Sequence, residues 1–125
     1  MTLASAHPVT FILSTDPGKL VPFYRDTLGL PVASEDAFAT VFDLGGVRLR
    51  LTRVEGHQPS PHTVLGWNVA DMAGTMKALK EKGVTFLVYP GFGQSDDGVW
   101  TSPDGLAKIA WFNDPEGNNL SITGS

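Results

Sequence analysis

The chain has 125 residues, with 9 basic and 13 acidic side chains and a formal net charge of −4. This length suits one domain, or two small halves that share one core. The acidic balance argues against a nucleic-acid partner, and the lack of cysteine excludes disulfides, thiol catalysis and cysteine-bound metals. No stretch has the roughly 18 apolar residues of a membrane span. We see no signal peptide, so we expect a cytoplasmic protein without a membrane partner.

The first half of the chain predicts a strand, a helix and three more strands. An apolar run at 9–14 is followed by Asp16, which can cap a helix that extends to about Thr27. Pro22 predicts that this helix is bent or starts late. Gly29 supplies the left-handed stop of this helix. Strands are predicted at 30–34, 38–44 and 47–54, and the last of them alternates apolar and polar residues. The polar segment 55–61 is predicted to be a linker.

The same pattern then repeats. A strand at 62–69 precedes a helix that Asp71 caps and Gly83 ends, and a further strand is predicted at 84–89. Segment 90–105 is predicted to be a long loop with a short strand at 99–101, and the last strands are predicted at 108–112 and 120–123. The spacing predicts two modules, at about 8–54 and 62–124, each a strand–helix–strand–strand–strand unit. We therefore expect an α+β fold in which the two modules form one domain, with a curved mixed sheet around a cleft.

Two motifs in this arrangement resemble those of a known superfamily. FYRDTLGL at 23–30 is similar to its first-helix signature, and DPEGN at 114–118 is similar to its closing hairpin. The superfamily is the vicinal-oxygen-chelate group, which contains glyoxalase I, bleomycin-resistance and fosfomycin-resistance proteins and extradiol dioxygenases. The resemblance implies a cleft lined by one sheet face, helices on the other face, and a homodimer. It also implies metal ligands (His, Glu or Gln) on the first and fourth strands of each module.

The positions that the resemblance assigns to metal ligands hold other residue types here. They fall at Val9, Arg50, Val64 and Ser121. Valine has no lone pair, arginine is permanently cationic, and a lone serine is a poor ligand, so we expect a cleft without metal or other cofactor. One alternative stays open, namely a metal site formed by His7 and His62. Each of these histidines precedes a valine position by two residues and therefore has the same strand parity.

Strand parity also predicts which side chains face the cleft. The predicted ligand-binding residues are Phe11, Arg48, Arg50, Asn68, Trp111 and Ser121. They combine apolar surface with cations and neutral hydrogen-bonding groups, which suits a small organic molecule with an anionic or carbonyl end. Other interpretations stay open: the two arginines could solvate a strand face, and Asn68 could make a structural hydrogen bond. The sequence does not decide whether Trp111 or Phe112 faces the cleft, or whether Trp100 is a lid or a packing anchor.

Three functions follow from this pattern. The first is a metal-independent small-molecule-binding protein, similar to the bleomycin-resistance branch. The second is a metal-dependent lyase or dioxygenase, similar to glyoxalase I, whose ligands are displaced. The third is an interaction module with a filled cleft. No residue is assigned a catalytic role, because the sequence holds no nucleophile elbow and no carboxylate pair on the predicted cleft face.

Overall fold

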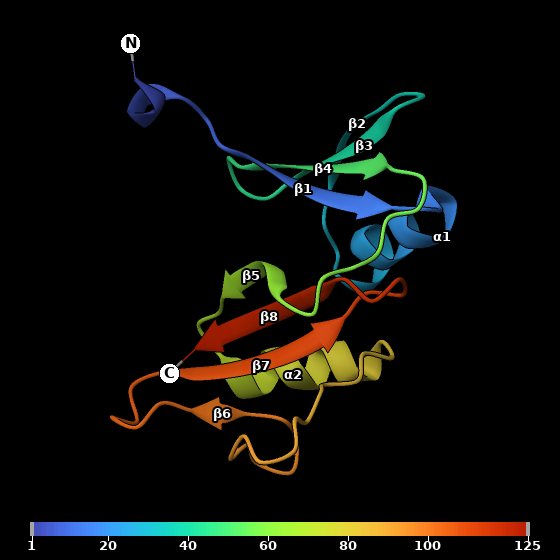
Figure 1. Ribbon diagram of the computed structural model, residues 1–125. Helices are drawn as coiled ribbons and strands as arrows, with labels where there is room; N and C mark the ends of the chain where they lie inside the picture. The colour runs from blue at the N-terminus through green and yellow to red at the C-terminus, as the bar shows by residue number, and fades with distance from the viewer. Residues whose placement is uncertain (1, 125) are drawn as a thin grey trace. The chain divides into compact units, whose positions relative to one another are not determined.

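The computed structural model describes residues 2–124 and divides into two compact units, the first ending at Gln58 and the second beginning at Pro59. Each unit has a four-stranded mixed sheet with helix on one face (Figure 1). The first unit contains η1 (Leu3–Ser5), β1 (Val9–Ser14), α1 (Pro17–Pro22), η2 (Phe23–Thr27), β2 (Val32–Glu35), β3 (Ala39–Asp43) and β4 (Arg48–Arg53). The second contains β5 (Thr63–Asn68), α2 (Met72–Glu81), β6 (Trp100–Thr101), β7 (Lys108–Asn113) and β8 (Asn119–Gly124).

The two sheets have the same topology. Their strand orders are β1-β4-β3-β2 and β5-β8-β7-β6. In each sheet the first and last strands of the unit pair in parallel, and the remaining pairs are antiparallel. The expected α+β fold with two similar modules is therefore confirmed.

The core of the first unit lies between its sheet and its helical segment. Alternation along the strands puts Leu49 and Phe42 on the helix side, where both are fully buried. The ring of Tyr24, also fully buried, lies 6.1 Å from that of Phe42. The apolar stripe in the first-helix motif is thus the surface that closes this core.

The first helix changes its hydrogen-bonding pattern along its length. After α1, the chain continues as the π-helical segment η2, in which the Leu28 N–H donates to the Phe23 carbonyl over 2.9 Å. Proline at position 22 has no N–H to give, which matches the predicted irregularity at this point. Gly29 follows with a φ of 73°, as expected for a left-handed stop.

The two helix-starting aspartates behave differently. Asp71 accepts a hydrogen bond from the Gly74 N–H over 3.0 Å, which confirms the predicted cap. The Asp16 side chain makes no capping bond, so that prediction is wrong. Its main-chain carbonyl instead accepts from the N–H groups of Lys19 and Leu20, and its carboxylate lies 4.0 Å from the Lys19 ammonium.

The core of the second unit lies between α2 and its sheet. Met72 and Met76 are the buried side chains of this helix. The sheet residues on the same side are also buried: Ala110, Phe112, Leu120 and Ile122. The amphipathic pattern of the second module therefore closes a core of its own.

The predicted strand at 84–89 is wrong. This segment makes a single bridge, between Phe86 and Phe112, and the edge of the sheet is formed instead by β6, where a short strand was expected. The Gln94 side chain supplies the missing bonds: its amide donates to the carbonyls of Leu87 and Gly98 and accepts from the Tyr89 N–H. A side chain that bonds the backbone in this way competes with a strand ladder.

The turn between β7 and β8 is built around the Asp114 carboxylate. One of its oxygens accepts from the N–H groups of Glu116 and Asn118, and the other accepts from the Asn118 side-chain amide over 2.8 Å. Both Asp114 and Asn118 are buried. The DPEGN motif thus sets where β8 begins.

Because the Gln94 side chain bonds the backbone of the 87–98 loop, we expect its removal to destabilise this loop. Gln94→Ala should lower the free energy of unfolding by about 1–3 kcal/mol, because it leaves polar groups of the 87–98 loop without partners. Amide hydrogen exchange should accelerate in this loop and stay unchanged in the first unit. Gln58→Ala, at an exposed glutamine, is the matched control. Unchanged exchange in the loop would contradict the assignment.

Candidate functional site

In each sheet, the face turned away from the helix carries the candidate site residues; we call this the helix-free face. On the first unit it consists of Val9, Phe11 and Leu13 of β1 and Arg48, Arg50 and Thr52 of β4, which are paired in register. Phe11 lies directly beside Arg50, and 56% of its surface is exposed. This face therefore combines exposed apolar surface with cationic groups.

The two arginines of this face have different surroundings. The Arg48 guanidinium is exposed and lies 3.8 Å from the Asp43 carboxylate. The pKa of Asp43 is lowered mainly by the N–H groups of Gly46 and Gly45 and further by the charge of Arg48. Arg48 thus has a partner on its own sheet, in line with the interpretation that it stabilises a strand face.

Arg50 is half-buried, and within residues 2–124 its guanidinium has no hydrogen bond or ion pair. The pKa of Asp36 is lowered mainly by the N–H groups of Phe38 and Ala39, and the charge of Arg50 lowers it further by a smaller amount. The Thr52 hydroxyl, on the same face, is buried and also has no partner in the described part of the chain. Arg50 is therefore the cation on this face that is available to a ligand.

The helix-free face of the second unit carries the other three predicted residues. Ser121 of β8 is paired in register with Gly66 of β5 and with Trp111 of β7, and Asn68 pairs with Thr123. Phe112 points to the opposite side, where it is fully buried and its ring lies 5.7 Å from that of Phe86. Trp111, not Phe112, therefore shares the face of Ser121. Asn68 is exposed, and no bond to another described residue engages its side chain.

The glycine beside Ser121 creates room for the serine hydroxyl. A Cβ atom at Gly66 would lie 2.5 Å from Ser121 Oγ, which is closer than side chains approach. Gly66 does not have a positive φ, so its role is to leave space rather than to relieve backbone strain. The pair therefore forms a notch in the sheet surface with a hydroxyl at its side.

Sequence reasoning missed two aromatic residues of this face, Tyr89 and Phe92. Their rings contact the Trp111 ring edge to face, with centroids 5.8 and 5.7 Å away, and Phe92 also lies 6.2 Å from Trp100. We call these four residues the aromatic wall. The Trp100 ring, on β6, contacts the loop through Phe92, which is in line with the interpretation of Trp100 as a packing anchor. The sequence feature that could have revealed Tyr89 and Phe92 is the aromatic content of segment 89–100, which the prediction of a long loop did not take into account.

A hydrogen-bond network lies next to the aromatic wall. The register shifts between Thr63 and Leu65, which brings Thr63 opposite Asn119, and the Thr63 hydroxyl donates to the Asn119 amide oxygen over 2.7 Å. The Asn119 amide nitrogen donates to the Tyr89 hydroxyl and to the Asn113 side-chain oxygen, each over 3.2 Å. Asn119 is buried, so this network fixes the position of the Tyr89 hydroxyl.

The residues present do not fit a divalent metal. The positions implied by the resemblance are Val9, Arg50, Val64 and Ser121, and among residues 2–124 no three His, Cys, Asp or Glu side chains come together to hold an ion. His7 and His62 are exposed, and among residues 2–124 neither belongs to a group of three or more His, Cys, Asp or Glu side chains that could hold an ion. The donor chemistry of this chain thus departs from that of the metalloenzymes it resembles.

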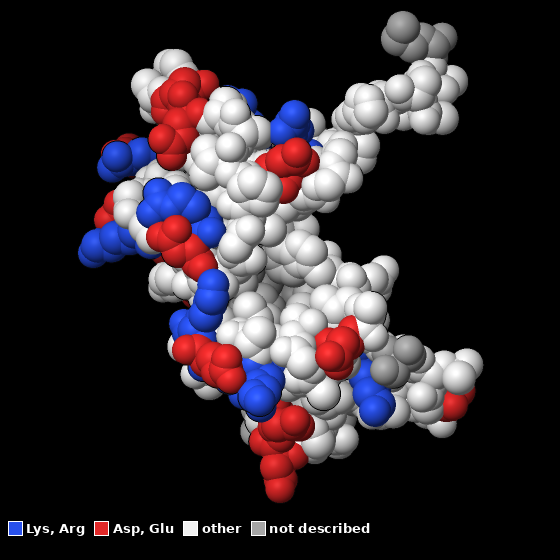
Figure 2. Space-filling view, turned by 180° about the vertical axis from the view of Figure 1, so that it is seen from behind, with Lys and Arg blue, Asp and Glu red and all other residues white. Residues whose placement is uncertain are grey.

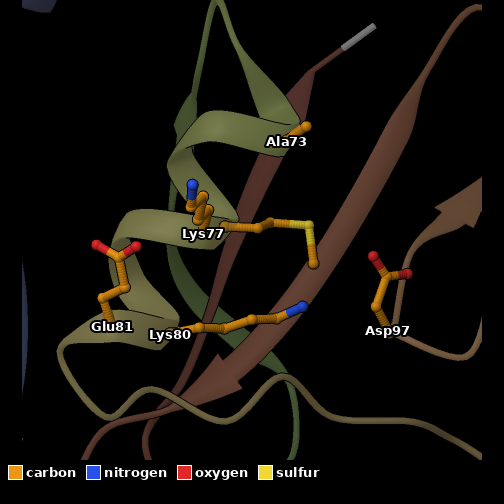
Figure 3. Close-up of a pocket in the computed structure, with 6 residues that line it drawn as sticks. Ala73, Lys77, Lys80, Glu81 and Asp97 are labelled. Atoms are coloured by element: carbon orange, nitrogen blue, oxygen red, sulfur yellow. The ribbon is translucent and has the colours of Figure 1, made fainter.

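Hollows of the second unit also lie on its helix side. One of about 390 Å³ is lined by residues of α2 and by Asp97, toward which Lys80 extends (Figure 3). The pKa of Asp97 is lowered mainly by the Ser95 hydroxyl, which donates a hydrogen bond to its carboxylate. Burial raises this pKa, and the positive charge of Lys80 lowers it further. Lys80 also lies 5.8 Å from the Phe86 ring centroid. Because these charges are engaged within the chain, we place the candidate site on the helix-free faces.

The charged surface is mixed in sign. On the face drawn in Figure 2, Lys and Arg side chains are interspersed with Asp and Glu. A surface of this kind gives no extended positive field for a polyanion to follow.

Comparison with known proteins identifies the fold family. The sequence model of the Glyoxalase/Bleomycin resistance protein/Dioxygenase superfamily matches residues 6–122. The chain belongs to this superfamily. No curated protein matched. Within residues 2–124, no helix is long and apolar enough to cross a bilayer.

Several solved structures share this fold at low sequence identity. The structure of SMU.1112c is 18% identical, with a TM-score of 0.76 over 95% of this chain and 98% of that one. A glyoxalase/bleomycin resistance protein/dioxygenase from Nocardioides is 18% identical, with a TM-score of 0.73 over 94% and 81%. TnmS3, an antibiotic binding protein from Streptomyces sp. CB03234, is 19% identical, with a TM-score of 0.72 over 96% and 95%.

The notch at Gly66 gives a test by paired substitutions. Gly66→Ala should lower the free energy of unfolding by about 1–3 kcal/mol, because its Cβ overlaps Ser121 Oγ. In a Ser121→Ala background the cost should fall, since the nearest remaining atom is the Ser121 carbonyl oxygen at 3.4 Å. Gly18→Ala, whose Cβ would lie 3.5 Å from its nearest neighbour, is the control. An equal cost in both backgrounds, measured by urea unfolding, would refute this contact.

Proposed function

We propose that this protein is a metal-independent small-molecule-binding protein of the glyoxalase/bleomycin-resistance type. Its ligand is an organic molecule with an anionic or carbonyl group. The residues proposed for binding are Phe11, Arg48 and Arg50 on the helix-free face of the first unit and Asn68, Trp111 and Ser121 on that of the second, and each face is considered by itself. The observation that carries the proposal is the half-buried Arg50 guanidinium, which has no hydrogen bond or ion pair within residues 2–124 and lies beside an exposed phenylalanine.

The physical argument begins with the cost of a half-buried charge. A guanidinium that is partly removed from water loses hydration, and a carboxylate or a carbonyl oxygen would restore hydrogen bonds to it. Arginine binds such groups in a fork of two parallel hydrogen bonds. The family resemblance assigns Arg50 to a position of a metal ligand in the metalloenzymes, so a fixed positive charge would stand where an ion would otherwise supply one.

The surroundings of Arg50 favour an organic anion over a simple inorganic ion. Phe11 and Val41 are its register neighbours on β1 and β3, and both offer apolar surface. A ligand with an apolar body and one charged end would contact both kinds of surface at once. The antibiotic-binding relative TnmS3 supports a binding role for this fold.

The anion-binding role of Arg50 is tested by charge removal. Arg50→Gln should weaken the binding of aromatic carboxylates about tenfold or more, since a charge-assisted hydrogen bond is lost. Binding of the corresponding primary amides should change little. Arg53→Gln, at an exposed arginine of the same strand, should leave both unchanged. Thermal-shift screening selects the carboxylates, and calorimetry of tag-free protein gives the affinities.

Two results would overturn the proposal. One is equal affinity of wild type and Arg50→Gln for every carboxylate that binds. The other is stabilisation of tag-free protein by Ni²⁺ or Zn²⁺ with none by any organic compound, which would favour the metal-dependent lyase or dioxygenase instead.

We also propose a homodimer, as the family resemblance implies. Sedimentation equilibrium should give twice the mass of the chain at micromolar concentration, and a monomer throughout would refute it.

A further inference from the structure

We propose that the helix-free face of the second unit binds a planar aromatic ring that carries an acceptor oxygen, and that the Tyr89 hydroxyl donates a hydrogen bond to this oxygen. The inference rests on the proposed small-molecule-binding function and narrows its ligand class. It concerns residues of the second unit alone, so it can fail separately from the role of Arg50.

The aromatic wall provides the apolar part of this site. Tyr89 and Phe92 remain 37% and 47% exposed although both contact Trp111. The planes of these two rings make angles of 75° and 80° with the Trp111 plane. The rings of Tyr89 and Phe92 also meet each other at a steep angle of 69°. None of these three ring pairs is stacked face to face, so a further flat ring can pack on the parts of Tyr89 and Phe92 that stay exposed.

The loop holds this exposed aromatic surface in place. Phe92 lies between Gly91 and Gly93, which both have a φ of 75°, and the Gln94 side chain bonds the backbone on each side of the loop. Burial of the Phe92 ring in the core would remove more apolar surface from water than its position on this loop does. Its exposed position on a fixed support is therefore suited to contact with a ligand.

The Tyr89 hydroxyl provides the polar part. It accepts a hydrogen bond from the Asn119 amide nitrogen, so its own proton is left to donate. Among residues 2–124 no acceptor takes that proton. Asn119 is in turn held by the Thr63 hydroxyl, and this orders the donor before any ligand arrives.

These two parts together define the ligand chemistry. The hydroxyl belongs to one of the aromatic rings, so an oxygen that it binds must be attached close to the ring that packs on the wall. Quinones, aryl ketones and phenolates meet this requirement, whereas saturated acids and aromatic hydrocarbons lack one of the two features.

The experiment uses two probes that differ in ring oxygens. Anthraquinone-2-sulfonate has two carbonyl oxygens on its ring system, and anthracene-2-sulfonate has none. We expect wild-type protein to bind the quinone more tightly. Tyr89→Phe should weaken quinone binding about three- to tenfold and leave anthracene-2-sulfonate unchanged, as measured by titration calorimetry.

A second variant tests the aromatic surface without touching the sheet. Phe92→Leu should weaken both probes by a similar factor, because it removes a ring but no hydrogen bond. Phe38→Leu, at a phenylalanine of the first unit that is 76% exposed, should change neither. Unchanged melting temperatures for all three variants would show that the fold is intact.

The outcomes separate this inference from the proposed function. Equal effects of Tyr89→Phe on both probes would overturn the hydrogen bond, and no effect of Phe92→Leu would overturn the aromatic site. If carboxylates bind through Arg50 while neither sulfonate binds, this inference fails and the proposed function stands. If no organic molecule binds, both fail.

Discussion

The parallel pairing of the first and last strands in each unit is the constraint on which the site depends. In a strand, successive side chains point to opposite faces, so the register of one pair decides every neighbour on both faces. The pairing of β1 with β4 puts Phe11 beside Arg50, and that of β5 with β8 puts Gly66 beside Ser121. A slip of one residue in either pair would bury these groups under a helix and expose the core.

The helices stabilise this register because they cover only one face. Tyr24 and Phe42 close the core of the first unit, and Met72 and Met76 close that of the second. The helix-free faces do not contribute to either helix–sheet core, so their side chains are free to differ in chemistry. One face carries a cation beside an exposed phenylalanine, and the other carries aromatic rings beside neutral hydrogen-bonding groups.

Local sequence patterns predicted the two-module fold and the faces of the side chains on β1, β4, β5 and β8. The alternation in 47–54 placed Arg48 and Arg50 on one side, and the repeated spacing of aspartate and glycine revealed the second module. The choice between Trp111 and Phe112 required the register with β8, which is a long-range property. The segment 84–89 was mistaken for a strand because its β-forming residues carry no sign that Gln94, five or more positions away, bonds their backbone. The aromatic wall was missed for the same reason: loop residues share no period, and only tertiary structure brings Phe92 to Trp111.

The Asp114 turn has a consequence for how this chain is recognised. Its carboxylate is fully engaged by the backbone and amide of its own five-residue loop, and both polar side chains are buried. Asp114 and Asn118 of the DPEGN motif therefore serve the hairpin itself, and their polar atoms are occupied within it. A sequence match that depends on this hairpin therefore identifies the fold of the chain, whereas the candidate site residues lie on the strands and carry no part of that signature.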